Sequence, residues 1–317
     1  MISLSALLLP LAVWVSYSKQ YDTLWSNHAL ADREIEAIAD QHVSTVFLTL
    51  SGAAPGLKQI ANRRDPFTAN LQSVLNRLAA HHVAACAAIL SDTFTGSSAQ
   101  MARTTAVDNV LAFNSTATAG DARFVCVSTD LEMTKEGHTP RVYDLWKSFH
   151  ASLRQRIASR GGDLKVVAWI QGPDYLMAHL SPEDRQSLMA REHITLDPAD
   201  TSLYDGALRY FTTSNAAPIV DAVIPMWYFT PTDAYKRHVD HGLRELEALR
   251  LPTLQLMPGI MVRNQRAGLC CPGCVTGRAD YDSRIDQSAR DHTHTPALAG
   301  TAVFMWPIPA GWTCPGT

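Results

Sequence analysis

The chain has 317 residues, of which 46% are hydrophobic and 18% are charged, and its formal net charge is -3. This is the composition of an ordinary soluble globular protein. It excludes the strongly basic surface that binds nucleic acid or an anionic membrane. The length allows either two average domains or one large α/β barrel.

The N-terminal stretch from Ile2 to Val15 is nearly uncharged but is an incomplete signal peptide. It has no basic residues ahead of the apolar run and no clean cleavage site made of small residues. The run is also too short for a membrane span. We therefore interpret Leu11 to Tyr17 as the first strand of the fold, and we expect no membrane span.

Apolar, strand-like runs recur along the chain, and most are followed by an amphipathic stretch. After Leu11 to Tyr17, the runs are 44–50, 82–90, 123–132, 164–171, 222–228, 253–258 and 300–306. Helical spacing of apolar residues is found in 32–40, 67–80, 100–113, 142–160 and 233–249. Segment 172–217 is expected to hold one or two helices with loops.

Eight apolar strands that alternate with helices predict an α/β fold with a parallel sheet covered on its faces. Eight such units in about 300 residues favour a single (β/α)8 TIM barrel. We expect residues 1–317 to form this one catalytic domain, since no linker divides the chain. The alternative is an open doubly wound sheet, but no Gly-x-Gly-x-x-Gly motif opens a first helix to support a nucleotide site.

The fourth strand carries the chemistry. Side chains on a strand alternate between its two faces. One face carries Phe124, Cys126, Ser128, Asp130 and Glu132. The other face carries Val125, Val127, Thr129 and Leu131, and it suits burial under helices. Two carboxylates that are two residues apart at a strand end repel each other and separate their pKa values, which is what acid–base catalysis needs.

In TIM barrels the reacting groups gather at the C-terminal ends of the strands. Besides the acidic pair, these ends carry Tyr17, Asp92, Gln171, Met226, Tyr228 and Trp306, and Asp174 follows shortly after the fifth strand. Since Asp130 and Glu132 share a strand face, Asp130 is poorly placed to attack a glycosidic bond from the side opposite Glu132. This arrangement fits a substrate that supplies its own nucleophile, such as a 2-acetamido carbonyl.

These residues resemble the family 18 glycoside hydrolases, which are the chitinases and endo-β-N-acetylglucosaminidases. The resemblance is carried by Asp130-Leu-Glu132, by Met226-Trp-Tyr228 and by Trp306. The fourth strand of the family usually reads Asp-x-x-Asp-x-Asp-x-Glu, whereas Val125 and Ser128 stand here at two of the aspartates. The third strand also lacks the two glycines that the family tends to have.

The resemblance implies a role for each matching residue. Glu132 would protonate the glycosidic oxygen, and Asp130 would orient the acetamido group. Tyr228 would hydrogen-bond the acetamido carbonyl, and Trp306 would form an apolar floor beneath the sugar ring. Ser128 can hydrogen-bond Asp130 but cannot share a charge with it, so we expect slower turnover or a shifted pH optimum. Further candidates for substrate binding are Ser128, Met226, Tyr17, Asp92 and Gln171.

Two other functions compete with a glycosidase that cleaves glycans containing N-acetylhexosamine. One is a lectin-like barrel that binds carbohydrate without turnover, although retention of Glu132 favours the enzyme. The other is a barrel glycosidase with a different second carboxylate, either Asp92 or Asp174. The expected partner is an oligosaccharide or polysaccharide, with no cofactor, no nucleic acid and a monomeric chain.

Cysteine usage bears on the compartment. Cys86 and Cys126 fall in apolar runs and are interpreted as buried free thiols. A second group, Cys270, Cys271, Cys274 and Cys314, predicts a loop stapled by disulfides and hence a secreted protein or another oxidising compartment. Zinc is the alternative, with His292 or His294 as a further ligand, but a second ligand pair is missing and we expect no metal. Asn114-Ser-Thr116 fits a glycosylation acceptor.

Overall fold

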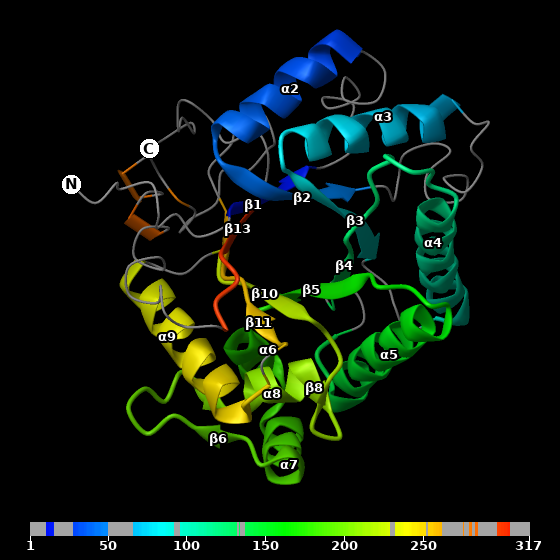
Figure 1. Cartoon of the computed structure of the whole chain (residues 1–317). Coiled ribbons are helices and arrows are strands. Elements are labelled where there is room, and N and C mark those ends of the chain that lie inside the picture. Colours follow the sequence, from blue (N-terminus) through cyan, green and yellow to red (C-terminus); the bar gives the residue numbers. More distant parts are fainter. Residues whose placement is uncertain are drawn as a thin grey trace.

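The fold is that of the computed structural model of the whole chain. It describes residues 11–15, 28–49, 66–91, 96–131, 133, 137–228, 232–251, 253–261, 275, 279–280, 283–284 and 297–304. Figure 1 looks along a ring of strands with helices arranged around it. In the described part of the chain, the ring is closed by parallel pairing throughout, because β13 pairs with β1 and β10 pairs with β5. The predicted (β/α)8 TIM barrel is therefore confirmed.

The order of strands around the ring is β1, β2, β3, β4, β5, β10, β11 with β12, and β13. The barrel strands are β1 (Leu11–Val15), β2 (Val43–Thr49), β3 (Ala84–Ser91), β4 (Cys126–Leu131), β5 (Lys165–Gln171), β10 (Ala222–Met226), β11 (Gln255–Leu256), β12 (Gly259–Met261) and β13 (Thr301–Phe304). The seventh position is shared by two short strands, since Pro258 lies between β11 and β12 and has no N–H to donate to a ladder. The predicted strand, 253–258, covers β11 and ends at Pro258, so β12 lies beyond it.

The helices of the barrel units agree with the predicted helical stretches. They are α2 (His28–Asp40), α3 (Pro66–Ala80), α4 (Ser97–Ser115), α5 (Pro140–Ser159) and α9 (Thr232–Leu249). Helix α5 begins after Thr139, whose hydroxyl accepts a hydrogen bond from the Val142 backbone N–H at 3.3 Å. It ends before Gly161, which has a φ of +65°, a left-handed conformation that favours glycine after a helix.

The segment between β5 and β10 is more elaborate than predicted. Its elements are α6 (Pro173–His179), α7 (Pro182–Glu192), β6 (Thr195–Leu196), β7 (Tyr204–Asp205), α8 (Ala207–Thr212), β8 (Thr213–Ser214) and β9 (Ala217–Pro218). The strands form two small antiparallel pairs, β6 with β7 and β8 with β9. Figure 1 shows α6 and α8 on the same side of the ring as β10 and α9.

Two apolar layers stabilise the barrel. The outer layer lies between the strands and the helices, and it includes Val127 and Leu131 of β4, as predicted. The inner layer fills the ring itself, where Trp169 packs edge-on against Trp14 and Phe47, with ring centroids 4.9 and 5.4 Å apart. Small residues from other strands leave room for these rings, so the inner layer is a packed core.

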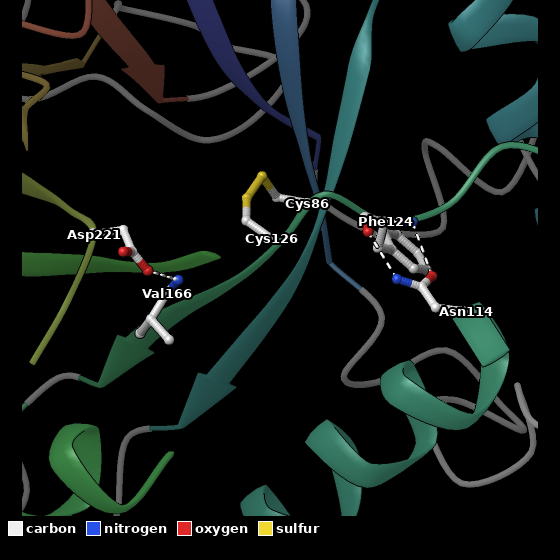
Figure 2. The surroundings of a disulfide bond; sticks show 6 residues. All are labelled: Cys86, Asn114, Phe124, Cys126, Val166 and Asp221. Atoms are coloured by element: carbon white, nitrogen blue, oxygen red, sulfur yellow. Dashed lines mark hydrogen bonds between the residues drawn. A yellow bond between two sulfur atoms is a disulfide. The ribbon is translucent and has the colours of Figure 1, made fainter. Parts of the chain in front are cut away.

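The first residues of the predicted fourth strand depart from strand alternation. Figure 2 shows the side chain of Asn114 in α4 bound to the backbone of Phe124 by two hydrogen bonds, of 3.0 Å from the Phe124 N–H and 2.8 Å to its carbonyl. Phe124 therefore packs in the outer layer against Phe113, and Val125 is exposed. The prediction that Phe124 shares the inner face was wrong. Asn114, the first residue of the predicted glycosylation triplet, thus joins the end of α4 to the segment before β4.

Cys86 and Cys126 form a disulfide, so the prediction of two free thiols was wrong. The two residues are direct partners in the β3–β4 ladder, with Cα atoms 4.6 Å apart, and both side chains belong to the inner layer (Figure 2). Strand alternation predicts that both side chains point into the ring. It does not predict that the two residues lie opposite each other, because that depends on how β3 and β4 pair. The other four cysteines, Cys270, Cys271, Cys274 and Cys314, lie outside the described residues, as do His292 and His294.

The seam between β5 and β10 is held at its N-terminal end by Asp221. Its carboxylate accepts a hydrogen bond from the Val166 N–H at 2.8 Å (Figure 2). The carboxylate also forms an ion pair with Arg154 at 2.9 Å. The backbone N–H of Asp221 donates to the Val166 carbonyl at 2.7 Å.

In the described part of the chain, no helix is both long enough and apolar enough to cross a membrane.

Candidate active site

A cavity of about 590 Å³ opens at the C-terminal end of the barrel, which is where catalytic sites of this fold lie. Its lining residues are Asp130, Gln171, Gly172, Asp174, Tyr175, Ala178, Ser202, Met226, Trp227, Tyr228, His238, Met261 and Phe304. We call the part lined by Asp130, Met226, Tyr228, Met261 and Phe304 the mouth. We call the part lined by Asp174, Tyr175, Ser202, Trp227 and His238 the outer part, and Gln171 lies where β5 ends between them. The volume is in the usual range for sites that bind small molecules.

Asp130 is held at the mouth by both neighbouring strands. In the ladders it pairs with Leu90 of β3 and with Trp169 of β5, and it is only 6% exposed. Two residues earlier on the same inner face, the Ser128 hydroxyl is buried and has no hydrogen-bond partner among the described residues. Ser128 thus lies on β4 next to Asp130 on the inner face, on the side of the N-terminal end of the strand, and forms no hydrogen bond with it.

The outer face of the same strand is fixed by α5. The Thr129 hydroxyl lies 2.7 Å from His150 Nε2, and His150 Nδ1 lies 2.9 Å from the Trp146 carbonyl. Because a carbonyl only accepts, Nδ1 carries the proton and Nε2 accepts from Thr129. Burial lowers the pKa of His150 to about 4, so the ring is neutral near pH 7. This fixes the strand segment that carries Asp130.

Tyr228 lies just beyond the end of β10, which is separated from β4 in the ring by β5 alone. Its ring stacks on Phe304 of β13, with centroids 5.7 Å apart and planes 27° apart. Gly259 of β12 lies under the ring, and a Cβ there would be 3.4 Å from Tyr228 Cε1 and 2.8 Å from the Pro225 carbonyl oxygen. Glycine is therefore needed for the close approach of β12 and for the position of the tyrosine.

Met226 and Gln171 complete the predicted set at the mouth. They are partners in the β5–β10 ladder, and both side chains are partly buried against the cavity. The buried Gln171 Oε1 has no hydrogen-bond partner among the described residues. An amide with an unused acceptor at a cavity wall is suited to bind a ligand hydroxyl or N–H.

The outer part contains an aspartate–histidine pair. Asp174 of α6 is 7% exposed and accepts the Tyr204 backbone N–H at 2.9 Å. Its other oxygen lies 3.1 Å from His238 Nδ1 in α9. The His238 ring also stacks on Trp227, with centroids 5.5 Å apart and planes 26° apart. Asp174 is thus engaged on both oxygens, which makes it an orienting group rather than a free acid.

Tyr175 and two histidines form the rim beside this pair. The Tyr175 ring lies against His179 with centroids 3.8 Å apart and planes tilted by 32°, and the ring centroids of His138 and His179 are 5.1 Å apart. Burial and the neighbouring His179 together lower the pKa of His138. Tyr175 is 47% exposed, so this rim is an accessible aromatic surface.

In the described residues, one cluster has the donor types of a metal site: Asp197, Asp205 and His241. These groups already satisfy one another and their neighbours. Asp197 accepts the Ala199 N–H at 2.7 Å and the Arg244 guanidinium at 2.9 Å, and His241 Nε2 lies 2.9 Å from Asp205. The Ala199 N–H is the main reason why the pKa of Asp197 is lowered. With a guanidinium in place, the cluster is an ion-pair network beside the barrel.

The structure brings together Asp130, Ser128, Gln171, Met226 and Tyr228 from the predicted site. Glu132, Tyr17, Asp92 and Trp306 lie outside the described residues. Trp227 packs against Tyr235 in the outer layer and also lines the cavity.

Sequence reasoning missed His238, Phe304, Met261, Ser202 and Tyr175. Phe304 had a usable signal, because it comes two residues before Trp306 in the sequence and strand alternation predicts one face for both. His238 had none, because only the packing of α9 beside α6 brings it to the cavity.

The comparisons with known proteins identify the fold. No protein-family model matches the chain, and no curated protein matches its sequence. A β-mannanase from Thermomonospora fusca, solved as a mannohexaose complex, is 14% identical over 95% of this chain and 80% of its own, with a TM-score of 0.51. A GH5-4 broad-specificity endoglucanase from Clostridium longisporum is 10% identical over 90% of this chain and 78% of its own, with a TM-score of 0.51.

A GH18 chitinase from Pseudoalteromonas aurantia is 14% identical over 94% of each chain, with a TM-score of 0.48. At such identities the likeness concerns the fold alone, and this last score is too low to favour one family. The solved structures thus agree with the TIM barrel, and the resemblance to family 18 remains a prediction from the sequence.

Proposed function

We propose that the protein is a glycoside hydrolase whose active site is the mouth of the barrel. The observation that carries this proposal is the convergence of Asp130 on β4 and Tyr228 just after β10 on one cavity at the C-terminal end of the barrel. An aromatic ring, Phe304, stacks behind the tyrosine. A carboxylate, a phenol and apolar ring faces are what a site needs to bind a sugar and act on its glycosidic bond.

Within this proposal, Glu132 is the general acid and Asp130 orients the acetamido group of an N-acetylhexosamine. Glu132 follows Asp130 by two residues, so strand alternation assigns both to the same face. Asp130 is buried beside the protein core, where a carboxylate acts strongly on a neighbouring charge. The acetamido oxygen attacks the anomeric carbon as Glu132 protonates the leaving oxygen, and Tyr228 donates a hydrogen bond to that acetamido group.

The test is hydrolysis of a chromogenic chitobioside. We expect Glu132→Gln to lower kcat/KM by about 10²–10⁴-fold, which is the usual contribution of a general acid. The matched control is Asp163→Asn, another acid-to-amide change at an exposed position before β5, at the opposite end of the barrel. Unchanged activity in Glu132→Gln would remove the catalytic assignment.

A glycosidase with another second carboxylate is the main competing function, and Asp174 is its described candidate. The two hydrogen bonds on Asp174 speak against it as a nucleophile. Activity on chromogenic mannosides or cellobiosides, without activity on the N-acetylated substrate, would favour this alternative. Binding of chito-oligosaccharides without any turnover would favour the lectin-like barrel. The disulfide within the barrel supports secretion or another oxidising compartment as the location.

A further inference from the structure

The outer part of the cavity has features that the proposed catalytic residues do not explain. Asp174 and His238 come from elements that are not strands of the barrel, and they meet at the cavity wall. The carboxylate is fixed by the Tyr204 N–H and is almost fully buried. A buried carboxylate oriented in this way fixes a histidine for a task at its other ring nitrogen.

The proton arrangement of His238 follows from its partner. An ionised carboxylate only accepts hydrogen bonds, so Nδ1 carries a proton and donates to Asp174. Nε2 is then the ring atom left for a ligand. The stack on Trp227 fixes the ring plane, and His238 keeps 18% of its side chain exposed. The imidazole is thus held in one orientation at the cavity.

The surroundings indicate the class of ligand. Both oxygens of Asp174 are already hydrogen-bonded within the protein, so the polar atoms that the outer part offers to a ligand come from other side chains. Besides His238, these come from Gln171, whose Oε1 lacks a partner among the described residues, and from Ser202, whose hydroxyl donates to Asp200 at 2.6 Å and keeps its acceptor capacity. Tyr175, backed by His179, adds an accessible aromatic surface. A neutral, hydroxyl-rich ring with an apolar C–H face matches this combination.

We propose that the outer part of the cavity is a second sugar subsite, in which His238, oriented by Asp174, hydrogen-bonds a hydroxyl of the sugar unit next to the one at the mouth. The proposal rests on the proposed function for the carbohydrate nature of the ligand. It adds that the ligand is at least a disaccharide and that affinity increases when the second unit is present.

The experiment compares two substitutions that differ in which histidine nitrogen they replace. In His238→Asn the amide stands near the place of Nδ1, so the contact with Asp174 can be kept while the ligand contact is lost. In His238→Gln the amide reaches toward the place of Nε2. Binding of GlcNAc, chitobiose and chitotetraose is measured by calorimetry in the Glu132→Gln background, which prevents turnover. His81→Ala, at an exposed position before β3 at the other end of the barrel, is the control.

We expect the protein with an unaltered outer part, Glu132→Gln alone, to bind chitobiose and chitotetraose more tightly than GlcNAc. His238→Asn should weaken oligosaccharide binding by about three- to tenfold, which is the fold-change of one net hydrogen bond, and leave GlcNAc binding unchanged. His238→Gln should stay within about twofold of the parent. Asp174→Asn, which acts through His238, should reduce the same preference for the longer ligand without changing GlcNAc binding.

Equal affinity of the parent for GlcNAc and the oligosaccharides would overturn this inference while leaving the mouth as a sugar site. The same holds if His238→Asn keeps the full preference for oligosaccharides. If the parent binds none of these sugars, the inference is overturned, and hydrolysis of other chromogenic glycosides then decides separately whether the proposed function stands.

Discussion

The Tyr228 hydroxyl is a single group whose removal distinguishes substrate-assisted hydrolysis from other mechanisms at the mouth. The ring is positioned by Phe304 and Gly259, and neither contact needs the hydroxyl. Tyr228→Phe therefore keeps the packing and removes one donor. If that donor stabilises the acetamido group in the transition state, kcat/KM on the chromogenic chitobioside should fall about a hundredfold.

The control for Tyr228→Phe is the substrate rather than a second variant. A chromogenic cellobioside has no acetamido group. Any activity on this substrate should therefore be the same in the parent protein and in Tyr228→Phe. A loss of equal size on both substrates would contradict the assigned role and make Tyr228 a general part of the cavity wall.

At the scale of single elements, α5 and β4 are joined by a buried histidine that titrates on acidification. The pKa of His150 is lowered to about 4, mainly by burial and further by the charge of Arg103, against an ordinary value of 6.5. A histidine with a lowered pKa contributes stability above pH 6.5, and this contribution is lost as the pH falls toward 4. The difference between the lowered and the ordinary pKa of His150 corresponds to about 3 kcal/mol in the free energy of unfolding.

We expect the free energy of unfolding, measured by urea denaturation, to decrease between pH 6.5 and pH 4. His150→Gln cannot gain a proton, so its decrease over this range should be smaller than that of the parent by about 3 kcal/mol. Parallel curves for the two proteins would show that His150 does not control this part of the acid response. His81→Ala, an exposed histidine, should follow the parent curve.

The contact between β12 and β10 gives another prediction at this scale. A Cβ at Gly259 would lie 2.8 Å from the Pro225 carbonyl oxygen, which is closer than real Cβ contacts. Gly259→Ala should therefore move β12 away from β10 and shift the Tyr228 ring, lowering kcat/KM at least tenfold and stability by about 1–3 kcal/mol. Gly96→Ala is a matched control, because the space around Gly96 is open and its φ is negative. Full activity in Gly259→Ala would show that the mouth tolerates this shift.

The same elements show what the sequence could predict and where it could not. Apolar runs predicted all eight strand positions and the inner face of β4 from Cys126 onward, because strand alternation is local. Phe124 was misplaced because an Asn114 side chain from α4 fixes its backbone. The predicted seventh strand ended at Pro258, whereas the structure adds β12 after this proline. His238 and the β5–β10 insertion depend on packing between distant segments, which no local pattern encodes.

For the whole molecule, the disulfide has the largest expected effect on stability. It joins Cys86 and Cys126, which are separated by 40 residues and lie on neighbouring strands in the inner layer below Asp130. Closing a loop of this length restricts the unfolded chain, and the loop-entropy estimate is about 4 kcal/mol. The folded barrel keeps its β3–β4 ladder without the bond, so this gain is made largely by destabilising the unfolded state.

We therefore expect Cys86→Ala with Cys126→Ala to lower the free energy of unfolding, measured with guanidinium chloride, by about 4 kcal/mol, plus a smaller cost for lost packing. Added reductant should lower the stability of the parent toward that of the double variant once the protein is unfolded and refolded. Mass spectrometry of unreduced, alkylated tryptic peptides tests the bond itself. Alkylation of both cysteines in protein from an oxidising preparation would contradict the pairing and, with it, the structural argument that the chain folds in an oxidising compartment.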